Sequence, residues 1–137
     1  MNGYLVDKSA LARWSHEPVA QVLDELLDAG LLVSCDILDL EVLYSARSPR
    51  EYRRVQADRA LAYQYVVTSV AAQRQARSWQ ESLCARGLHR GPGVIDLLLA
   101  ATAQEHDLAL LHYDADFDVI AGVSQVQTRW VVPRGSL

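Results

Sequence analysis

The sequence has no run of about 18 uncharged apolar residues, the length that a membrane-spanning helix requires. Its first residues, Met1 to Asp7, lack a basic start followed by an apolar stretch, so they do not resemble a signal peptide. Only two cysteines are present, Cys35 and Cys84, and they form no Cys-x-x-Cys pair. Both have apolar neighbours, so we expect buried free thiols in a reducing cytosol, without a disulfide or a zinc site. These absences predict a cytoplasmic protein with no membrane segment.

Several common catalytic motifs are also missing. The turn at Arg90-Gly91-Pro92-Gly93 lacks the lysine and the spacing of a phosphate-binding loop. The histidines are scattered, and His112, close to Asp114, suits a structural hydrogen bond better than general-base chemistry. The acids of 114–118 begin like a calcium-binding loop, but Val119 and Gln125 replace the glycine and the glutamate that such a loop needs. Nucleotide, serine-hydrolase and calcium-sensor functions are therefore disfavoured.

Positive charge is scarce overall, since the net charge is −4, but arginines gather in two stretches. The first stretch contains Arg47, Arg50, Arg53, Arg54 and Arg59 against Glu51 and Asp58. The second contains Arg74, Arg77, Arg86 and Arg90 against Glu81. Either stretch is a solvated helix face or a rim that contacts phosphate groups.

The length of 137 residues and an apolar fraction of 50% indicate one domain with a substantial core, 1–137. We expect strands at 4–6, 31–34, 65–67, 108–112 and 126–132. We expect helices at 10–14, 19–29, 37–46, 49–61, 70–86, 94–106 and 117–121. The expected helix starts include Ser9 as the cap of 10–14, Asp36 as the cap of 37–46, Ser48 before 49–61, Ser69 before 70–86 and Pro18 in the first turn of 19–29. This alternation predicts an α/β domain with a mostly parallel central sheet flanked by helices. The tail at 133–137 resembles a protease-site linker or is native, so no functional argument uses it.

Asp96 is the only charge in the apolar stretch from Gly93 to Ala103. A carboxylate among apolar side chains is costly unless a cation or hydrogen-bond donors meet it. One interpretation is that Asp96 lies in the first helical turn, where free backbone amides stabilise an anion. The other is a functional role.

Asp7 and Asp114 each follow an expected strand, and ligands on open parallel sheets bind beyond the carboxyl ends of the strands. Either residue alone is better explained as a helix cap, but two acids at one edge of the sheet favour a site. Glu41 lies in a helix, 37–46, that is too apolar to offer much solvent-exposed surface. If Asp7, Glu41, Asp96 and Asp114 converge, they cannot all ionise without a counter-cation. Oxygen-only ligands suit Mg²⁺ or Mn²⁺, which can activate water and neutralise a phosphodiester.

The sequence segments that contain these acids resemble those of a known protein family. They are Leu5-Val6-Asp7-Lys8-Ser9, Glu41 in its apolar helix, Asp96-Leu97-Leu98-Leu99-Ala100-Ala101, and His112-Tyr113-Asp114-Ala115-Asp116-Phe117. In order and spacing they resemble PIN-domain ribonucleases, most of all the small toxins of bacterial VapBC toxin–antitoxin pairs. The resemblance implies a PIN-like fold, Mg²⁺- or Mn²⁺-dependent cleavage of RNA, a homodimer, and inhibition by a cognate antitoxin protein.

The resemblance also implies roles for individual residues. Its catalytic acids are matched by Asp7, Glu41, Asp96 and Asp114, and its metal ligands by Asp7, Asp96, Asp114 and Asp116. Ser9 matches a hydroxyl residue that orients ligands or water around the metal. Lys8 stands where the family commonly has threonine. RNA contacts are expected from Lys8, Arg47, Arg50 and Arg54.

The sequence therefore predicts an endoribonuclease toxin. The alternative is a non-catalytic PIN-like module that binds RNA or protein through its arginine-rich helices, with the acids acting only as caps and ion-pair partners.

Overall fold

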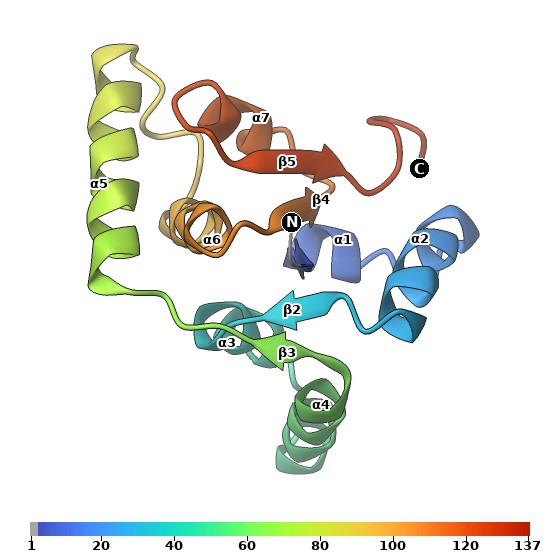
Figure 1. The fold of residues 1–137 in the computed structure, drawn as a ribbon. Coiled ribbons are helices and arrows are strands. Elements are labelled where there is room, and N and C mark those ends of the chain that lie inside the picture. Colours follow the sequence, from blue (N-terminus) through green and yellow to red (C-terminus); the bar gives the residue numbers. More distant parts are fainter. Residues whose placement is uncertain (1–2) are drawn as a thin grey trace.

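The computed structural model describes residues 3–137 and contains a five-stranded sheet. Its strands are β1 (Tyr4–Val6), β2 (Leu32–Ser34), β3 (Gln64–Tyr65), β4 (Ala109–His112) and β5 (Gln127–Trp130). They lie in the order β3-β2-β1-β4-β5, and every neighbouring pair is parallel (Figure 1). The predicted α/β fold is therefore confirmed, with a sheet that is parallel throughout.

Seven helices surround the sheet in the described part of the chain. They are α1 (Lys8–Leu11), α2 (Glu17–Asp28), α3 (Asp36–Leu43), α4 (Pro49–Ala62), α5 (Val70–Ala85), α6 (Val94–Glu105) and α7 (Asp116–Ala121). Figure 1 shows α6 between the sheet and α5, α2 on the other side, and α4 projecting beyond β3. Across 3–137, no helix has both the length and the apolar character needed to cross a membrane.

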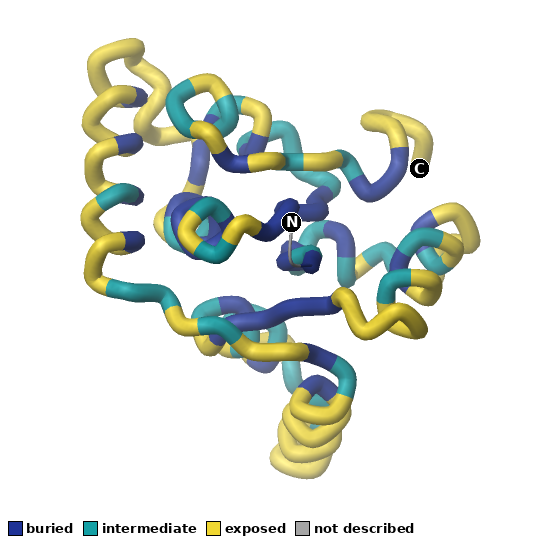
Figure 2. Tube along the Cα trace, viewed as in Figure 1, coloured by how far each residue is buried: buried dark blue, intermediate teal, exposed yellow. Residues whose placement is uncertain are grey.

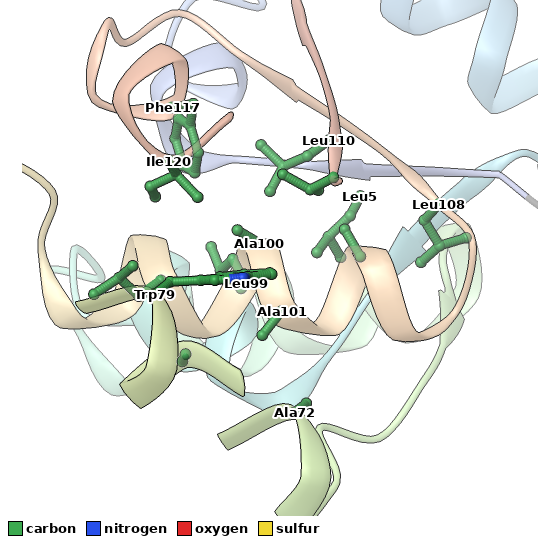
Figure 3. Packing of buried hydrophobic residues seen from close by; sticks show 14 of the residues in the cluster. Leu5, Ala72, Trp79, Leu99, Ala100, Ala101, Leu108, Leu110, Phe117 and Ile120 are labelled. Atoms are coloured by element: carbon green, nitrogen blue, oxygen red, sulfur yellow. The ribbon is translucent and has the colours of Figure 1, made fainter. Parts of the chain in front are cut away.

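The central strand β1 supplies both sides of the core. Leu5 and Val6 are fully buried and point to opposite faces of the sheet, as successive strand residues must. Leu5 belongs to the cluster built with α3, α5, α6 and α7, whereas Val6 belongs to the cluster built with α1 and α2. In Figure 3, Trp79 of α5 lies against α6 near Leu99, which joins the outer helix to the core.

Most helix ends follow the expected signals. Ser48 and Ser69 cap α4 and α5 through their hydroxyl groups, and Pro18 lies in the first turn of α2. Two expectations were wrong. Ser9 does not cap a helix at 10–14, because Asp7 caps α1 and the helix ends at Leu11. Asp36 is the first residue of α3 and not its cap.

Two expectations about burial were also wrong. Cys35 is buried, but Cys84 lies exposed on the outer side of α5. Arg59 is only 6% exposed, so it belongs neither to a solvated face nor to a phosphate-contacting rim. It is the only buried residue of α4, a helix that is otherwise largely exposed (Figure 2).

The topology places the chain segments that carry acids at one edge of the sheet. Strands β1 and β4 are neighbours, with Val6 opposite Leu111. Asp7 extends this pairing, because its backbone N–H donates to the Leu111 carbonyl at 2.8 Å. The segments after both strands therefore leave the sheet side by side.

Candidate active site

Asp7 has a buried carboxylate that is only partly satisfied. The residue is 4% exposed, and its Oδ2 atom accepts a hydrogen bond from the Ser9 backbone N–H at 2.9 Å. Its Oδ1 atom is buried and has no hydrogen-bond partner within residues 3–137. A buried anionic oxygen without a donor is costly, so this atom indicates a place for a cation.

Asp96 lies in the first turn of α6, and its interpretation as a helix cap is confirmed. Its Oδ2 atom accepts a hydrogen bond from the Gly93 N–H at 3.0 Å, which is the capping role. Its pKa is nevertheless raised to about 6, mainly by burial and also by the nearby Asp7, Asp114 and Glu41, against the effect of that hydrogen bond. Asp96 is therefore a helix cap that also faces three other acids.

The segment after β4 brings two more carboxylates to the same place. The Asp114 Oδ1 atom accepts a hydrogen bond from the Asp116 N–H at 2.9 Å, and the Asp114 N–H donates to His112 Nδ1 at 3.2 Å. The pKa of Asp116 is raised, mainly by burial and also by Asp114. Asp96, Asp114 and Asp116 each offer a carboxylate oxygen within 4.8 Å of the others.

Glu41 joins this group from α3. Burial raises the pKa of its carboxyl, Asp7 raises it further, and the Lys8 ammonium lowers it. Lys8 holds α1 against α3, because its Nζ atom donates to the Glu41 carbonyl at 3.1 Å and to Ser45 Oγ at 2.7 Å. These two hydrogen bonds place the Lys8 ammonium next to Glu41.

The predicted acids therefore converge. Asp7, Glu41, Asp96, Asp114 and Asp116 come from four separate parts of the chain and influence one another electrostatically. No ion pair within 3–137 joins any of them to a lysine or arginine. Oxygen-only donors and a partnerless buried carboxylate atom fit a hard divalent ion such as Mg²⁺ or Mn²⁺.

Ser9 links two sides of this site, because its Oγ atom accepts a hydrogen bond from the Tyr113 backbone N–H at 2.9 Å. Its own N–H binds Asp7, so one residue positions the segments that carry Asp7 and Asp114. His112 is fully buried between Phe117 and Trp130, and burial lowers the pKa of its imidazole. The structural hydrogen bond predicted for His112 is confirmed by its contact with the Asp114 N–H.

The arginines expected to contact RNA lie on and just before α4. Arg47, Arg50 and Arg54 are exposed, and Arg47 forms an ion pair with Glu51 at 3.6 Å. Within the described residues, no hydrogen bond or ion pair connects these arginines to the acids of the site, which are Asp7, Glu41, Asp96, Asp114 and Asp116.

Sequence reasoning missed a polar network beside the site. Asp39 accepts hydrogen bonds from Arg59, Ser34 and Tyr65, and thereby ties α3 to α4, β2 and β3. A signal for this network existed: Asp39 lies in the same apolar helix that drew attention to Glu41. Its partners could not be found by spacing, because Arg59 is 20 residues away.

Comparison with known proteins agrees with this geometry. The profile of the PIN domain family matches residues 4–123. Ribonuclease VapC51 from Mycobacterium tuberculosis is 40% identical over 134 residues, 98% of this chain and 96% of that protein. Ribonuclease VapC21 from the same organism is 39% identical over 133 residues, 97% of this chain and 96% of that protein.

Among solved structures, DNA-bound VapBC from Salmonella typhimurium has a chain with a TM-score of 0.76 at 14% identity, covering 96% of this chain and 100% of that chain. This similarity shows the fold. The sheet order, the acidic site and the matches together define a PIN domain. The chain belongs to the PIN domain family and, within it, to the VapC ribonucleases.

Proposed function

We propose that this protein is a metal-dependent endoribonuclease that acts as the toxin of a toxin–antitoxin pair. The observation that carries the proposal is the meeting of Asp96, Asp114 and Asp116 oxygens within 4.8 Å, beside the partnerless Oδ1 atom of Asp7. The VapC51 and VapC21 proteins, matched over nearly the whole chain, are both named ribonucleases.

Each acid has a proposed role. Asp7, Asp96, Asp114 and Asp116 hold Mg²⁺ or Mn²⁺, and Glu41 acts with Asp7, Asp96 and Asp114 in catalysis. A divalent ion bound there would lower the pKa of a water molecule and neutralise charge on the phosphodiester during in-line displacement. Ser9 positions the segments that bear Asp7 and Asp114 through its two hydrogen bonds.

The residues of the chain also control the charge of the site. With a pKa of about 6, Asp96 is mostly ionised at neutral pH, but its ionisation is held back by burial and by the other acids. The cluster therefore repels a bare phosphodiester and accepts one only when a cation offsets its charge. RNA must be held by positive groups outside the cluster, for which we propose Lys8, Arg47, Arg50 and Arg54.

We also propose a homodimer and a cognate antitoxin as partners. An apolar surface at α3 and α6 supports the homodimer, since Leu40 is 65% exposed, Tyr44 89% and Val94 67%. Leu40 and Tyr44 border a groove of about 370 Å³ that Glu41 also borders. Solved structures of the same fold include a toxin–antitoxin complex from Klebsiella pneumoniae, which supports the antitoxin. A cytoplasmic location accords with this role.

The experiment is cleavage of single-stranded RNA by the full chain with Mn²⁺. We expect products with a 5′-phosphate and a 3′-hydroxyl, and loss of cleavage in Asp96→Asn, in Asp7→Asn and with excess chelator. Asp28→Asn, which changes an exposed acid at the end of α2, is the charge-matched control.

A thermal shift separates the enzyme from the non-catalytic module. Mn²⁺ should raise the melting temperature of the wild type and of Asp28→Asn, but not that of Asp96→Asn. RNA cleavage that persists without any divalent ion would contradict the proposal, and RNA binding without Mn²⁺ binding would favour the module.

A further inference from the structure

A hollow on α5 lies on the side of the helix that faces away from the core. Its volume is about 540 Å³, and the polar side chains that border it are Arg74, Arg77, Ser78, Gln80, Glu81 and His89. The opposite side of α5 carries the buried residues Ala72, Ala76, Trp79 and Leu83. The helix therefore presents a polar outer surface, and Figure 2 shows that this side of α5 is exposed.

The basic side chains of this hollow are not paired with other side chains of the described residues. Across 3–137, the side chains of Arg74, Arg77 and His89 make no hydrogen bond and no ion pair with other residues. Glu81 is the only acid in the lining and forms no ion pair with the arginines. Two guanidinium groups against one carboxylate leave the hollow net positive in a chain whose net charge is −4.

One end of the hollow, at His89, lies near the acidic site. His89 borders the hollow, and two residues later Gly91 lies against the acids: a Cβ atom at Gly91 would be 3.9 Å from Asp116 Oδ1. Two residues of extended chain span at most about 7 Å. The positive hollow and the acidic cluster thus flank the same short loop.

We propose that this hollow binds a backbone phosphate of the single-stranded RNA, a few nucleotides away from the bond that is cleaved. The proposal rests on the ribonuclease function proposed above. An acidic cluster can hold only the phosphate that its metal neutralises, so the adjoining phosphates need cations of the protein. Arg74 and Arg77 provide planar donors that suit phosphate oxygens, and His89 and Ser78 add further donors.

The test measures binding of fluorescently labelled single-stranded RNA to the metal-free full chain over a series of salt concentrations. Arg74→Gln and Arg77→Gln should each weaken binding severalfold and reduce the salt slope by about 0.7, the value for one phosphate contact on a single strand. Glu81→Gln should tighten binding, because it removes the only negative charge of the lining. Arg74→Lys and Arg77→Lys should retain most of the salt slope.

The charge-matched control is Arg129→Gln. Arg129 is exposed and lies near Tyr4, in the cluster on the face of the sheet opposite α5. It should leave the salt slope unchanged. RNA length gives a second readout: the wild type should bind a long RNA more tightly than one that fills only the acidic site, and Arg74→Gln/Arg77→Gln should lose this preference.

The outcomes distinguish the two proposals. If the wild type cleaves RNA with Mn²⁺ but Arg74→Gln/Arg77→Gln binds like Arg129→Gln, the phosphate site is refuted and the ribonuclease stands. If the wild type neither cleaves nor binds RNA, both fail. Circular dichroism and melting temperature verify folding. If Arg74→Gln and Arg77→Gln unfold, Glu81→Gln and the lysine variants decide the question. An unchanged RNA affinity in Glu81→Gln would then count against the site.

Discussion

The Nε atom of Arg59 donates a hydrogen bond to Asp39 Oδ1 at 2.8 Å, in a place where neither side chain is more than 14% exposed. The guanidinium also donates to Ser34 Oγ at 2.9 Å and stacks over the Tyr63 ring, 4.3 Å from its centroid. Tyr65 donates its hydroxyl to the second Asp39 oxygen at 2.6 Å, and its pKa is raised to about 12, by burial first and then by Asp39. This network fixes α3, which also carries Glu41.

Arg59→Met should lower the free energy of unfolding by about 3–5 kcal/mol, because it leaves the Asp39 carboxylate buried without its counter-charge. Urea denaturation followed by circular dichroism measures the change. Arg54→Gln, an exposed change on the same helix, should stay within about 0.5 kcal/mol of the wild type. A loss for Arg59→Met as small as that of Arg54→Gln would contradict the structural role.

Asp96 should make the metal-free protein less stable as the pH rises. Its folded pKa of about 6 lies above the ordinary value of 3.8, so the folded state holds the proton more tightly than the unfolded chain. The resulting stability is present below pH 3.8 and is lost as the pH rises through about 6.

Asp96→Asn cannot ionise and should therefore gain stability relative to the wild type between pH 4 and pH 7 in the presence of chelator. We expect a gain of about 1–2 kcal/mol at neutral pH, after allowance for solvent screening of a half-buried carboxyl. Melting temperatures measured across this pH range provide the comparison. A difference that does not vary with pH would show that Asp96 has an ordinary pKa.

Ser9→Ala should separate the two segments that Ser9 joins. The Tyr113 N–H loses its acceptor, which costs about 1–2 kcal/mol of stability. Because the same segment bears Asp114, we expect Mn²⁺ affinity to fall by about 10–100-fold, the range for residues that orient metal ligands. Isothermal titration measures it, and Ser9→Thr, which keeps the hydroxyl, should bind Mn²⁺ nearly as well as the wild type.

Gly3→Ala should destabilise the central strand. Gly3 has a φ of 140°, and a Cβ atom there would come within 2.8 Å of Val33 Cγ2 and 2.9 Å of the Leu31 carbonyl oxygen. We expect a loss of about 2 kcal/mol or more, since both the backbone conformation and the space are unfavourable. Gly30→Ala is the control: its φ is 70° and no atom lies within 4 Å of the added carbon, so it carries the backbone strain alone.

Local patterns were sufficient for the fold and for the acids. Short apolar strands that alternate with helices determine a parallel sheet, and such a sheet brings the residues after β1 and β4 to one edge. That is why Asp7 and Asp114 could be paired before any coordinates were known. Asp96 and Glu41 were detectable because burying a charged side chain in an apolar helix costs free energy unless a partner offsets the charge.

Tertiary contacts decided the rest. Arg59 has the same exposed-helix pattern as Arg54, and only the position of Asp39 on another helix makes it a buried residue. Cys84 follows the apolar Leu83, but Leu83 is on the buried side of α5 and Cys84 is on the exposed side. Ser9 gave a signal typical of a helix cap, whereas its hydroxyl is used by Tyr113, 104 residues away.

The shortness of the edge strand β3 has a consequence for the behaviour of the protein at high concentration. Strand β3 contains only Gln64 and Tyr65. In chain order α4 precedes it, and the segment leading to α5 follows it. This edge therefore exposes few unpaired backbone N–H and C=O groups to which a strand of another molecule could hydrogen-bond. The protein is thereby protected from cross-β aggregation at that edge.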